Sequence, residues 1–172
     1  IAIIGQFATI NSVKFLLGFE FPYLISNFII FLGILSNLYL YYFDNNPQIS
    51  NKSSFIYLLI DIFQLSALLY LTGGVLNPFS IFLIIPSIFS SSNLDIKTNL
   101  TLITITLFII VFLTFFSYDL PYPINEKLKI DNYYYFSIPL SLIVALIFLN
   151  YFAITFGKES RLRKEALDKI QE

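Results

Sequence analysis

A short stretch between two apolar runs, residues 70–79, contains side chains that could bind a flat, lipid-soluble ring. Its sequence is Tyr-Leu-Thr-Gly-Gly-Val-Leu-Asn-Pro-Phe. A ring could lie against the backbone of Gly73 and Gly74, which have no Cβ, and the carboxamide of Asn77 could serve a carbonyl group as donor. A quinone needs such an apolar slot near the membrane surface, with one or two hydrogen-bonding groups. The aromatic side chains available for stacking are Tyr70 and Phe79.

The same stretch, which we call the 70–79 joint, also forms a complete helix stop and helix start without any ligand. Two adjacent glycines end a helix, because glycine readily adopts the left-handed conformation of a C-terminal cap. Asn77 and Pro78 predict the start of the next helix, with Asn77 as the N-cap and Pro78 in the first turn. The residues alone leave both interpretations open, a turn and a binding site.

A second group of polar residues lies in the apolar run that leads into the joint. Tyr57, Asp61 and Gln64 follow the spacing i, i+4 and i+7, which places them on one face of a helix. An ionised Asp at the centre of a membrane helix costs about 2.5–3.5 kcal/mol, so Asp61 should face protein or water. Its candidate partners in the first apolar run are Gln6 and Lys14. These polar residues could sense or relay a signal, or they could simply hold the helices together.

The elements that must position these residues are membrane helices. The 172 residues are 57% hydrophobic and only 12% charged, whereas a soluble domain has about 25% charged residues. Most of the six apolar runs are long enough for a helix to cross the hydrocarbon core of about 30 Å, and they lack the alternation of membrane β-strands. The runs cover roughly residues 1–19, 22–43, 54–72, 78–90, 98–118 and 133–156.

The sequence therefore predicts an all-α, polytopic membrane protein with six transmembrane helices. The fourth should be short or kinked, because its run is brief and contains Pro86. Five of the ten Lys and Arg residues directly follow the sixth run, so the positive-inside rule places this end in the cytoplasm. The joint and the 119–131 loop then face the outside.

Residues 157–172 should continue the sixth helix out of the membrane. Their narrow apolar stripe is typical of the start of a signalling coiled coil, although a solvated tail has a similar composition. We expect a transmembrane domain over residues 1–156, followed by a cytoplasmic helix or linker. Since the first residue is Ile1, we also expect the chain to be part of a longer protein.

Several kinds of chemistry are excluded by composition. The chain has no Cys, His, Met or Trp, so it can form no disulfide, no His or Cys metal site and no His-based catalytic centre. It also lacks paired carboxylates on one helix and a phosphate-binding loop. The net charge of −1 gives no argument for nucleic-acid binding. We therefore expect no enzyme activity and no metal site in this segment alone.

Residues 68–79 resemble the GGxxNPF region of the RegB/PrrB/ActS family of bacterial redox-responsive sensor histidine kinases. The six apolar runs, the helix that carries Asp61 and Gln64, and the Gly5-Gln6 and Phe21-Pro22 pairs of the first hairpin are similar as well. The resemblance implies a homodimeric, multi-pass kinase of the bacterial inner membrane, with a cytoplasmic C-terminal end. Such a kinase would phosphorylate a response regulator.

The resemblance also implies that the joint binds ubiquinone and couples quinone redox state to autophosphorylation. The phosphoacceptor His, the ATP-binding region and the redox-active Cys of the family are not in this chain. Two other interpretations remain: a small transporter built on broken helices, and a structural anchor that dimerises a cytoplasmic domain. The residues of the family motif in this sequence are Gly73, Gly74, Asn77, Pro78 and Phe79.

Overall fold

The computed structural model describes residues 2–43, 51–121 and 130–171, and this part of the chain consists of helices and their connections. Residues 44–50, between the second and third apolar runs, and residues 122–129 of the expected 119–131 loop lie outside the described residues. The prediction of an all-α membrane protein is confirmed. The elements are α1 (Ala2–Phe15), α2 (Tyr23–Phe43), α3 (Asn51–Leu71), the 3₁₀ segments η1 (Gly74–Leu76) and η2 (Pro78–Ile84), α4 (Ile85–Asn93), α5 (Ile96–Phe115) and α6 (Asn132–Gln171).

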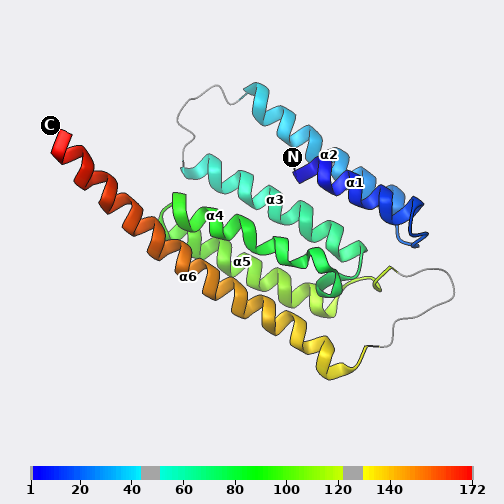
Figure 1. Ribbon diagram of the computed structural model, residues 1–172. Helices are drawn as coiled ribbons and strands as arrows, with labels where there is room; N and C mark the ends of the chain where they lie inside the picture. The colour runs from blue at the N-terminus through cyan, green and yellow to red at the C-terminus, as the bar shows by residue number, and fades with distance from the viewer. Residues whose placement is uncertain (1, 44–50, 122–129, 172) are drawn as a thin grey trace.

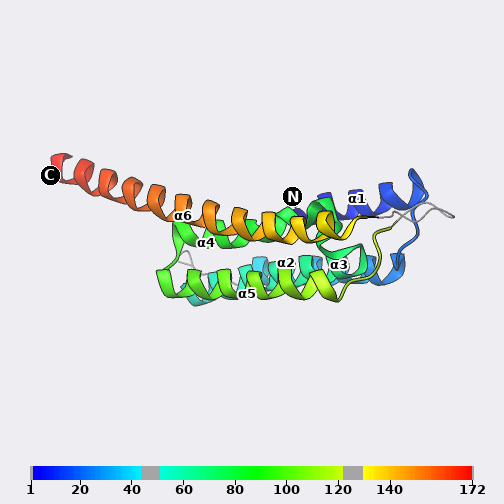
Figure 2. The same ribbon diagram turned by 90° about the horizontal axis from the view of Figure 1, so that it is seen from below.

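The helices run side by side in two layers (Figures 1 and 2). One layer contains α1, α4 and α6, and the other contains α2, α3 and α5. The main core lies among α3, α4, α5 and α6, where side chains such as Ile62, Leu102 and Leu146 are fully buried. A smaller cluster of Ile10, Ile30 and Leu68 joins α1 and α2 to α3. Large apolar side chains on every helix point outward, as they do in a protein surrounded by lipid.

Among the described residues, three helices are long and apolar enough to cross a membrane: α3, α5 and the first 29 residues of α6, Asn132–Ser160. The expected fourth helix is short and irregular, because it begins as the 3₁₀ helix η2 and becomes α-helical at Ile85. The narrower 3₁₀ helix rises further per residue. Its seven residues at about 2.0 Å each and the nine of α4 at about 1.5 Å together span roughly 28 Å. The 3₁₀ start therefore extends a short run to nearly the thickness of the hydrocarbon core.

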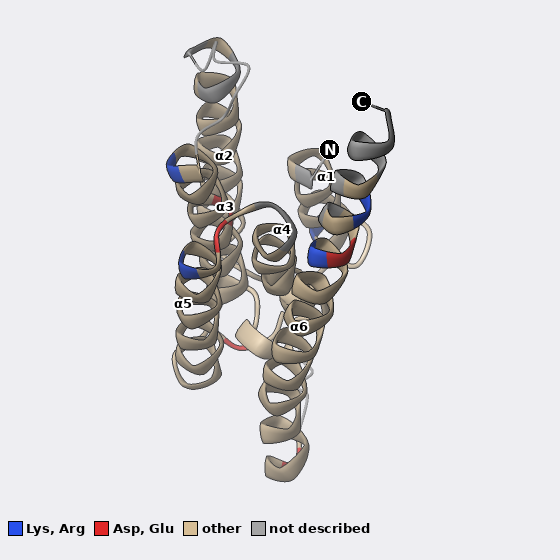
Figure 3. Cartoon of the chain, turned by 90° about the vertical axis from the view of Figure 1, so that its left-hand side faces the viewer, with Lys and Arg blue, Asp and Glu red and all other residues tan. Residues whose placement is uncertain are grey.

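The basic residues of three helices lie at one end of the bundle. Lys52 is in the first turn of α3, Lys97 is in the first turn of α5, and Lys158 and Arg163 are on α6 where it leaves the other helices. Figure 3 views the bundle from this end and shows the blue segments on these three helices. The 70–79 joint lies at the opposite end. This grouping is what the positive-inside rule requires of a cytoplasmic end, and the orientation itself stays a prediction.

The expected boundary between the sixth run and the cytoplasmic helix is not marked by a break. α6 is one continuous helix of 40 residues, Asn132–Gln171, although it contains Pro139. Its first turn is held by Asp131, whose carboxylate accepts from the backbone N–H of Tyr133 at 3.2 Å. Beyond residue 157 an i,i+4 ion pair joins Glu159 to Arg163 at 2.5 Å. A movement of α6 inside the bundle is therefore carried outward along a single helix.

Candidate functional site

The joint forms the helix stop and helix start that the sequence predicts. Gly73 and Gly74 have φ angles of 103° and 57°, in the region that favours glycine. Asn77 caps η2, because its Oδ1 accepts from the backbone N–H of Phe79 at 2.9 Å, and Pro78 follows it in the first turn. These angles and this cap turn the chain from α3 into the fourth helix.

The backbone faces of the two glycines are covered by a later part of the chain. A Cβ on Gly73 would lie 2.8 Å from Leu120 Cα, and one on Gly74 would lie 2.6 Å from Leu113 O. The hydroxyl of Ser117 also lies against Gly74, 2.5 Å from the position of such a Cβ. The glycines are therefore needed so that residues 117–121 and the end of α5 can pass directly over them. A ring could reach this surface only after Leu120 has moved.

The carboxamide of Asn77 is engaged at both ends. Besides accepting from Phe79, it donates from Nδ2 to Thr72 O at 3.0 Å and to Thr72 Oγ1 at 2.8 Å. The hydroxyl of Ser117, in contrast, makes no hydrogen bond within the described residues. Sequence reasoning did not select this residue, because it lies more than forty positions after the glycines. Its hydroxyl is a free donor beside the backbone of Gly74.

The two aromatic residues expected to stack on a ligand lie on separate partners. Tyr70, 36% exposed, stacks on Phe112 of α5 with ring centroids 6.2 Å apart, and the edge of Tyr118 meets it at 5.5 Å. Phe79, 42% exposed, contacts the ring of Phe82 at 5.8 Å. Tyr70 is thus part of the cover of the joint, whereas Phe79 lies on its open, lipid-facing side.

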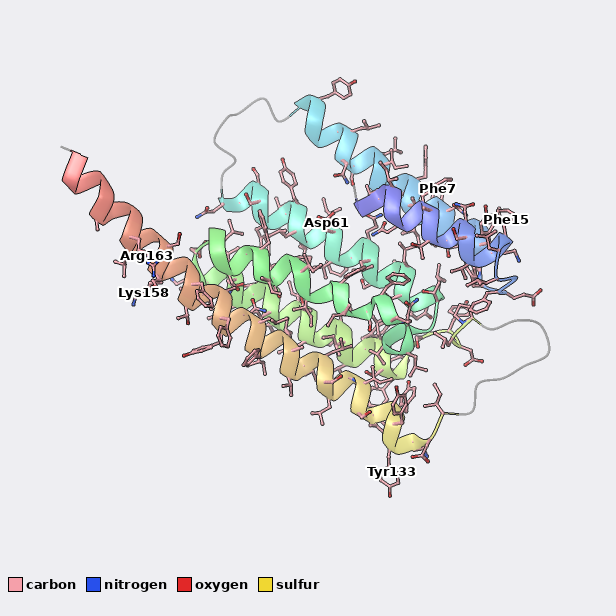
Figure 4. All side chains as sticks on the ribbon, in the orientation of Figure 1. Phe7, Phe15, Asp61, Tyr133, Lys158 and Arg163 are labelled. Atoms are coloured by element: carbon pink, nitrogen blue, oxygen red, sulfur yellow. The ribbon has the colours of Figure 1, made fainter. Side chains whose placement is uncertain are left out.

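The polar residues of α1 and α3 divide into a half-buried pair and an exposed acid. Gln64 Nε2 donates to Gln6 Oε1 at 3.1 Å, so Gln6 pairs with Gln64 and not with Asp61. Asp61 is the central residue of α3, is exposed, and has no hydrogen bond or ion pair among the described residues (Figure 4). Tyr57 is half-buried, and Lys14 lies in the last turn of α1. The geometry therefore brings Gln6 and Gln64 together and leaves Asp61 and Lys14 apart.

A buried polar cluster among α4, α5 and α6 was not anticipated from the sequence. Asn150 of α6 donates to Ser87 Oγ of α4 at 2.9 Å, and Ser91 of α4 donates to Asn150 Oδ1. Asn99 and Thr106 of α5, seven residues apart on one face, are also buried. Each of these residues is an uncharged polar side chain within or beside an apolar run. That pattern could have indicated interhelical contacts, but it is less conspicuous than a charged residue.

This arrangement defines the class of protein, a polytopic helical membrane domain with a broken fourth helix and a sixth helix that extends beyond the bundle. Over 167 residues, 96% of its length, the chain is 27% identical to the sensor histidine kinase RegB of Cereibacter sphaeroides. It spans 36% of the length of that relative. No family model and no solved structure gives a significant match. The expected resemblance to a RegB-type transmembrane sensor domain is confirmed, and it supports a sensor-kinase membrane domain.

Proposed function

We propose that this chain is the membrane sensor domain of a homodimeric two-component histidine kinase, which binds ubiquinone at the 70–79 joint and couples quinone redox state to autophosphorylation. The observation that carries the proposal is the similarity to RegB along 96% of the chain. The kinase lies in the bacterial inner membrane with its C-terminal end in the cytoplasm, and it passes phosphate to a response regulator. Gly73, Gly74, Asn77, Pro78 and Phe79 form the quinone site, with Tyr70 at its edge.

The quinone ring takes the place of the Leu120 side chain over Gly73. Phe79 stacks on the ring from the lipid side, since its own ring is partly exposed there. Ser117, whose hydroxyl is free beside Gly74, donates to a quinone carbonyl, while Asn77 keeps the turn in shape through its bonds to Thr72 and Phe79. The ligand thus binds more tightly to the state in which residues 117–121 have moved than to the state in which they cover the glycines. A switch needs such a difference in affinity between two states.

The signal then reaches α6 through the end of α5. The hydroxyl of Tyr135, in the first turn of α6, donates to the backbone carbonyl of Thr114, one turn before Ser117. A displacement of residues 117–121 therefore acts directly on the start of α6. Because α6 is continuous to Gln171, the displacement is transmitted to whatever follows it in the cytoplasm.

Binding of a short-chain ubiquinone analogue to the purified protein in nanodiscs tests the proposal. Phe79→Ala and Ser117→Ala should each weaken binding about tenfold, the effect of losing one ring contact or one hydrogen bond in an apolar site. Phe82→Ala is the matched control, because Phe82 is a similarly exposed neighbour on η2, 47% exposed, and should leave the affinity unchanged. Wild-type affinity in both Phe79→Ala and Ser117→Ala would overturn the assignment of the site.

A second candidate function, a structural anchor that dimerises a cytoplasmic kinase, is favoured by one observation. Every hydrogen-bonding group of Asn77 is already used in the turn, and the glycine faces are covered without a ligand. This function predicts that autophosphorylation of the whole kinase in nanodiscs, membrane domain and kinase core together, is independent of quinone redox state. A change of autophosphorylation on reducing the quinone pool, lost in Phe79→Ala and kept in Phe82→Ala, would exclude it.

A further inference from the structure

A cavity of ≈ 320 Å³ lies at the end of the bundle where α6 leaves the other helices. It is far from the 70–79 joint, which is at the opposite end, and its interpretation does not depend on the proposed quinone site. The cavity opens between the start of α5 and the middle of α6, close to the expected membrane boundary. Its lining residues are Ser91, Leu94, Asp95, Ile96, Asn99, Ile154, Gly157, Lys158 and Leu162.

The carboxamide of Asn99 in this cavity has no partner. The residue is 1% exposed, and neither Nδ2 nor Oδ1 makes a hydrogen bond in the described structure. The neighbouring hydroxyl of Ser91 is directed toward Asn150 Oδ1 and the carbonyl of Ser87, and no hydrogen bond joins it to Asn99. A buried amide without partners destabilises a protein by about 1–3 kcal/mol for each group left unpaired. The cavity therefore suits a molecule that offers Asn99 both an acceptor and a donor.

Among the described residues, the lining of the cavity contains one acidic and one basic side chain. Asp95 caps α5, with its carboxylate accepting from the backbone N–H and the hydroxyl of Thr98 at 3.1 and 2.7 Å, and its oxygens retain further lone pairs. Lys158 lies on α6 and has no ion pair among the described residues (Figure 4). The remaining wall is apolar: Leu94, Ile96, Ile154 and Leu162.

We propose that this cavity binds the headgroup of a phospholipid that carries both a phosphate and a primary amine. The phosphate accepts from Lys158 Nζ and Asn99 Nδ2, while the ammonium donates to Asp95 and Asn99 Oδ1. Both charges and both free amide atoms thereby gain partners. The acyl chains leave along the apolar wall into the bilayer. A phosphocholine headgroup lacks the N–H donors, and an anionic phosphoglycerol headgroup brings no cation to Asp95.

Lipid retention measured by native mass spectrometry tests the proposal. The protein is taken from nanodiscs that contain equal amounts of phosphatidylethanolamine, phosphatidylcholine and phosphatidylglycerol with identical acyl chains. We expect a roughly tenfold preference for retained phosphatidylethanolamine, the effect of one or two charge-assisted hydrogen bonds that choline cannot make. Equal retention of the three lipids would overturn the proposal.

Variants separate the site from general lipid binding. Asn99→Leu and Lys158→Gln should each abolish the preference, as should Asp95→Asn, in which Asn still caps α5. Lys97→Gln is the control, because Lys97 lies at the same end of α5 but does not line the cavity, and it should keep the preference. A preference that survives in Asn99→Leu and Lys158→Gln would overturn the assignment. The melting temperature of the protein in pure phosphatidylcholine is also measured with soluble phosphoethanolamine. If the soluble compound raises it as much as phosphatidylethanolamine does, the ligand is not a lipid.

Discussion

The carboxamide of Gln64 on α3 lies against the bare backbone of Gly33 on α2, so closely that a Cβ at position 33 would stand 2.2 Å from Gln64 Nε2. The same nitrogen donates to Gln6 Oε1 of α1. The missing side chain at position 33 thus lets one amide connect three helices. This contact, with the apolar cluster around Ile30, is what attaches the α1–α2 hairpin to the rest of the bundle.

Gly33→Ala should destabilise the protein by about 0.5–1.5 kcal/mol, because Gln64 must turn away and an interhelical hydrogen bond, about 0.6 kcal/mol on average in membranes, is lost. The free energy of unfolding in mixed micelles measures this. Gly5→Ala is the control: no atom lies within 4 Å of its Cβ position, so it should be neutral or stabilising. If the destabilisation acts through Gln64, Gly33→Ala should change the free energy of unfolding very little in a Gln64→Ala background. Fully additive losses in the double variant would contradict a role of Gln64.

Gly74→Ala should be among the most damaging substitutions in the chain. A side chain there combines a φ of 57° with a contact of 2.6 Å to the backbone carbonyl of Leu113, which cannot turn aside. Gly18 provides the matched control, because its φ is 67° but no atom lies within 4 Å of its Cβ position. Gly18→Ala should destabilise by about 1–2 kcal/mol from backbone strain alone, and Gly74→Ala by clearly more. Equal decreases in melting temperature for Gly18→Ala and Gly74→Ala would show that residues 113–120 are not held tightly over the joint.

Local chemistry explains which parts of the site the sequence could predict. The caps at Gly73, Gly74 and Asn77 depend on residues within one turn of each other, so the residue types were sufficient. The cover of the glycines by Leu120 depends on the path of the chain after α5, for which no local signal exists. The sequence therefore predicted the shape of the joint but not that its backbone is already occupied.

Helix rotation explains a second difference. Tyr57, Asp61 and Gln64 share a face by spacing, yet Gln64 is drawn inward by Gly33 and Gln6 while Asp61 stays exposed. Spacing predicts which residues lie near one another on a helix but not which helix they meet. The length of the fourth element differs for another reason. η2 is a 3₁₀ helix that packs against α3 and α6, and a count of apolar residues predicts neither its conformation nor these contacts.

Asn77→Ala should cost about 1–2 kcal/mol, because it removes both the N-cap of η2 and the donation to Thr72. Asn77→Ser keeps an oxygen that can cap the helix and should recover most of that loss. Melting temperature and quinone affinity are measured on the same samples. Both variants leave the proposed ligand contacts, Phe79 and Ser117, unchanged. Each should therefore bind quinone in proportion to its folded fraction. An Asn77→Ser protein of normal stability that no longer binds would instead make the Asn77 carboxamide a direct ligand contact.

The start of α5 should loosen in acid. The hydroxyl of Thr98 and, next, its backbone N–H donate to the carboxylate and hold the pKa of Asp95 below its usual value. Since the folded pKa is the lower one, the stabilisation is present above the unfolded pKa and is lost as the pH falls below about 4. Hydrogen exchange of the first-turn amides of α5, compared with Asp95→Asn at the same pH, measures the effect. The variant should lack the acid-dependent increase, and an identical increase in both proteins would contradict the role of Asp95.

Two buried asparagines should respond in opposite directions to the same substitution. Asn150 connects α6 to α4 through Ser87 and Ser91, so Asn150→Leu loses these interhelical bonds, and we expect a destabilisation of about 1–2 kcal/mol. Asn99 has no partner for either amide atom, so Asn99→Leu removes an unsatisfied group and should stabilise the protein in phosphatidylcholine by about 1 kcal/mol or more. In phosphatidylethanolamine that gain should shrink, because the wild-type amide is then paired with lipid. The free energies of unfolding of the two variants in the two lipids give four values. A gain for Asn99→Leu that is the same in both lipids would mean that the lipid never reaches the amide.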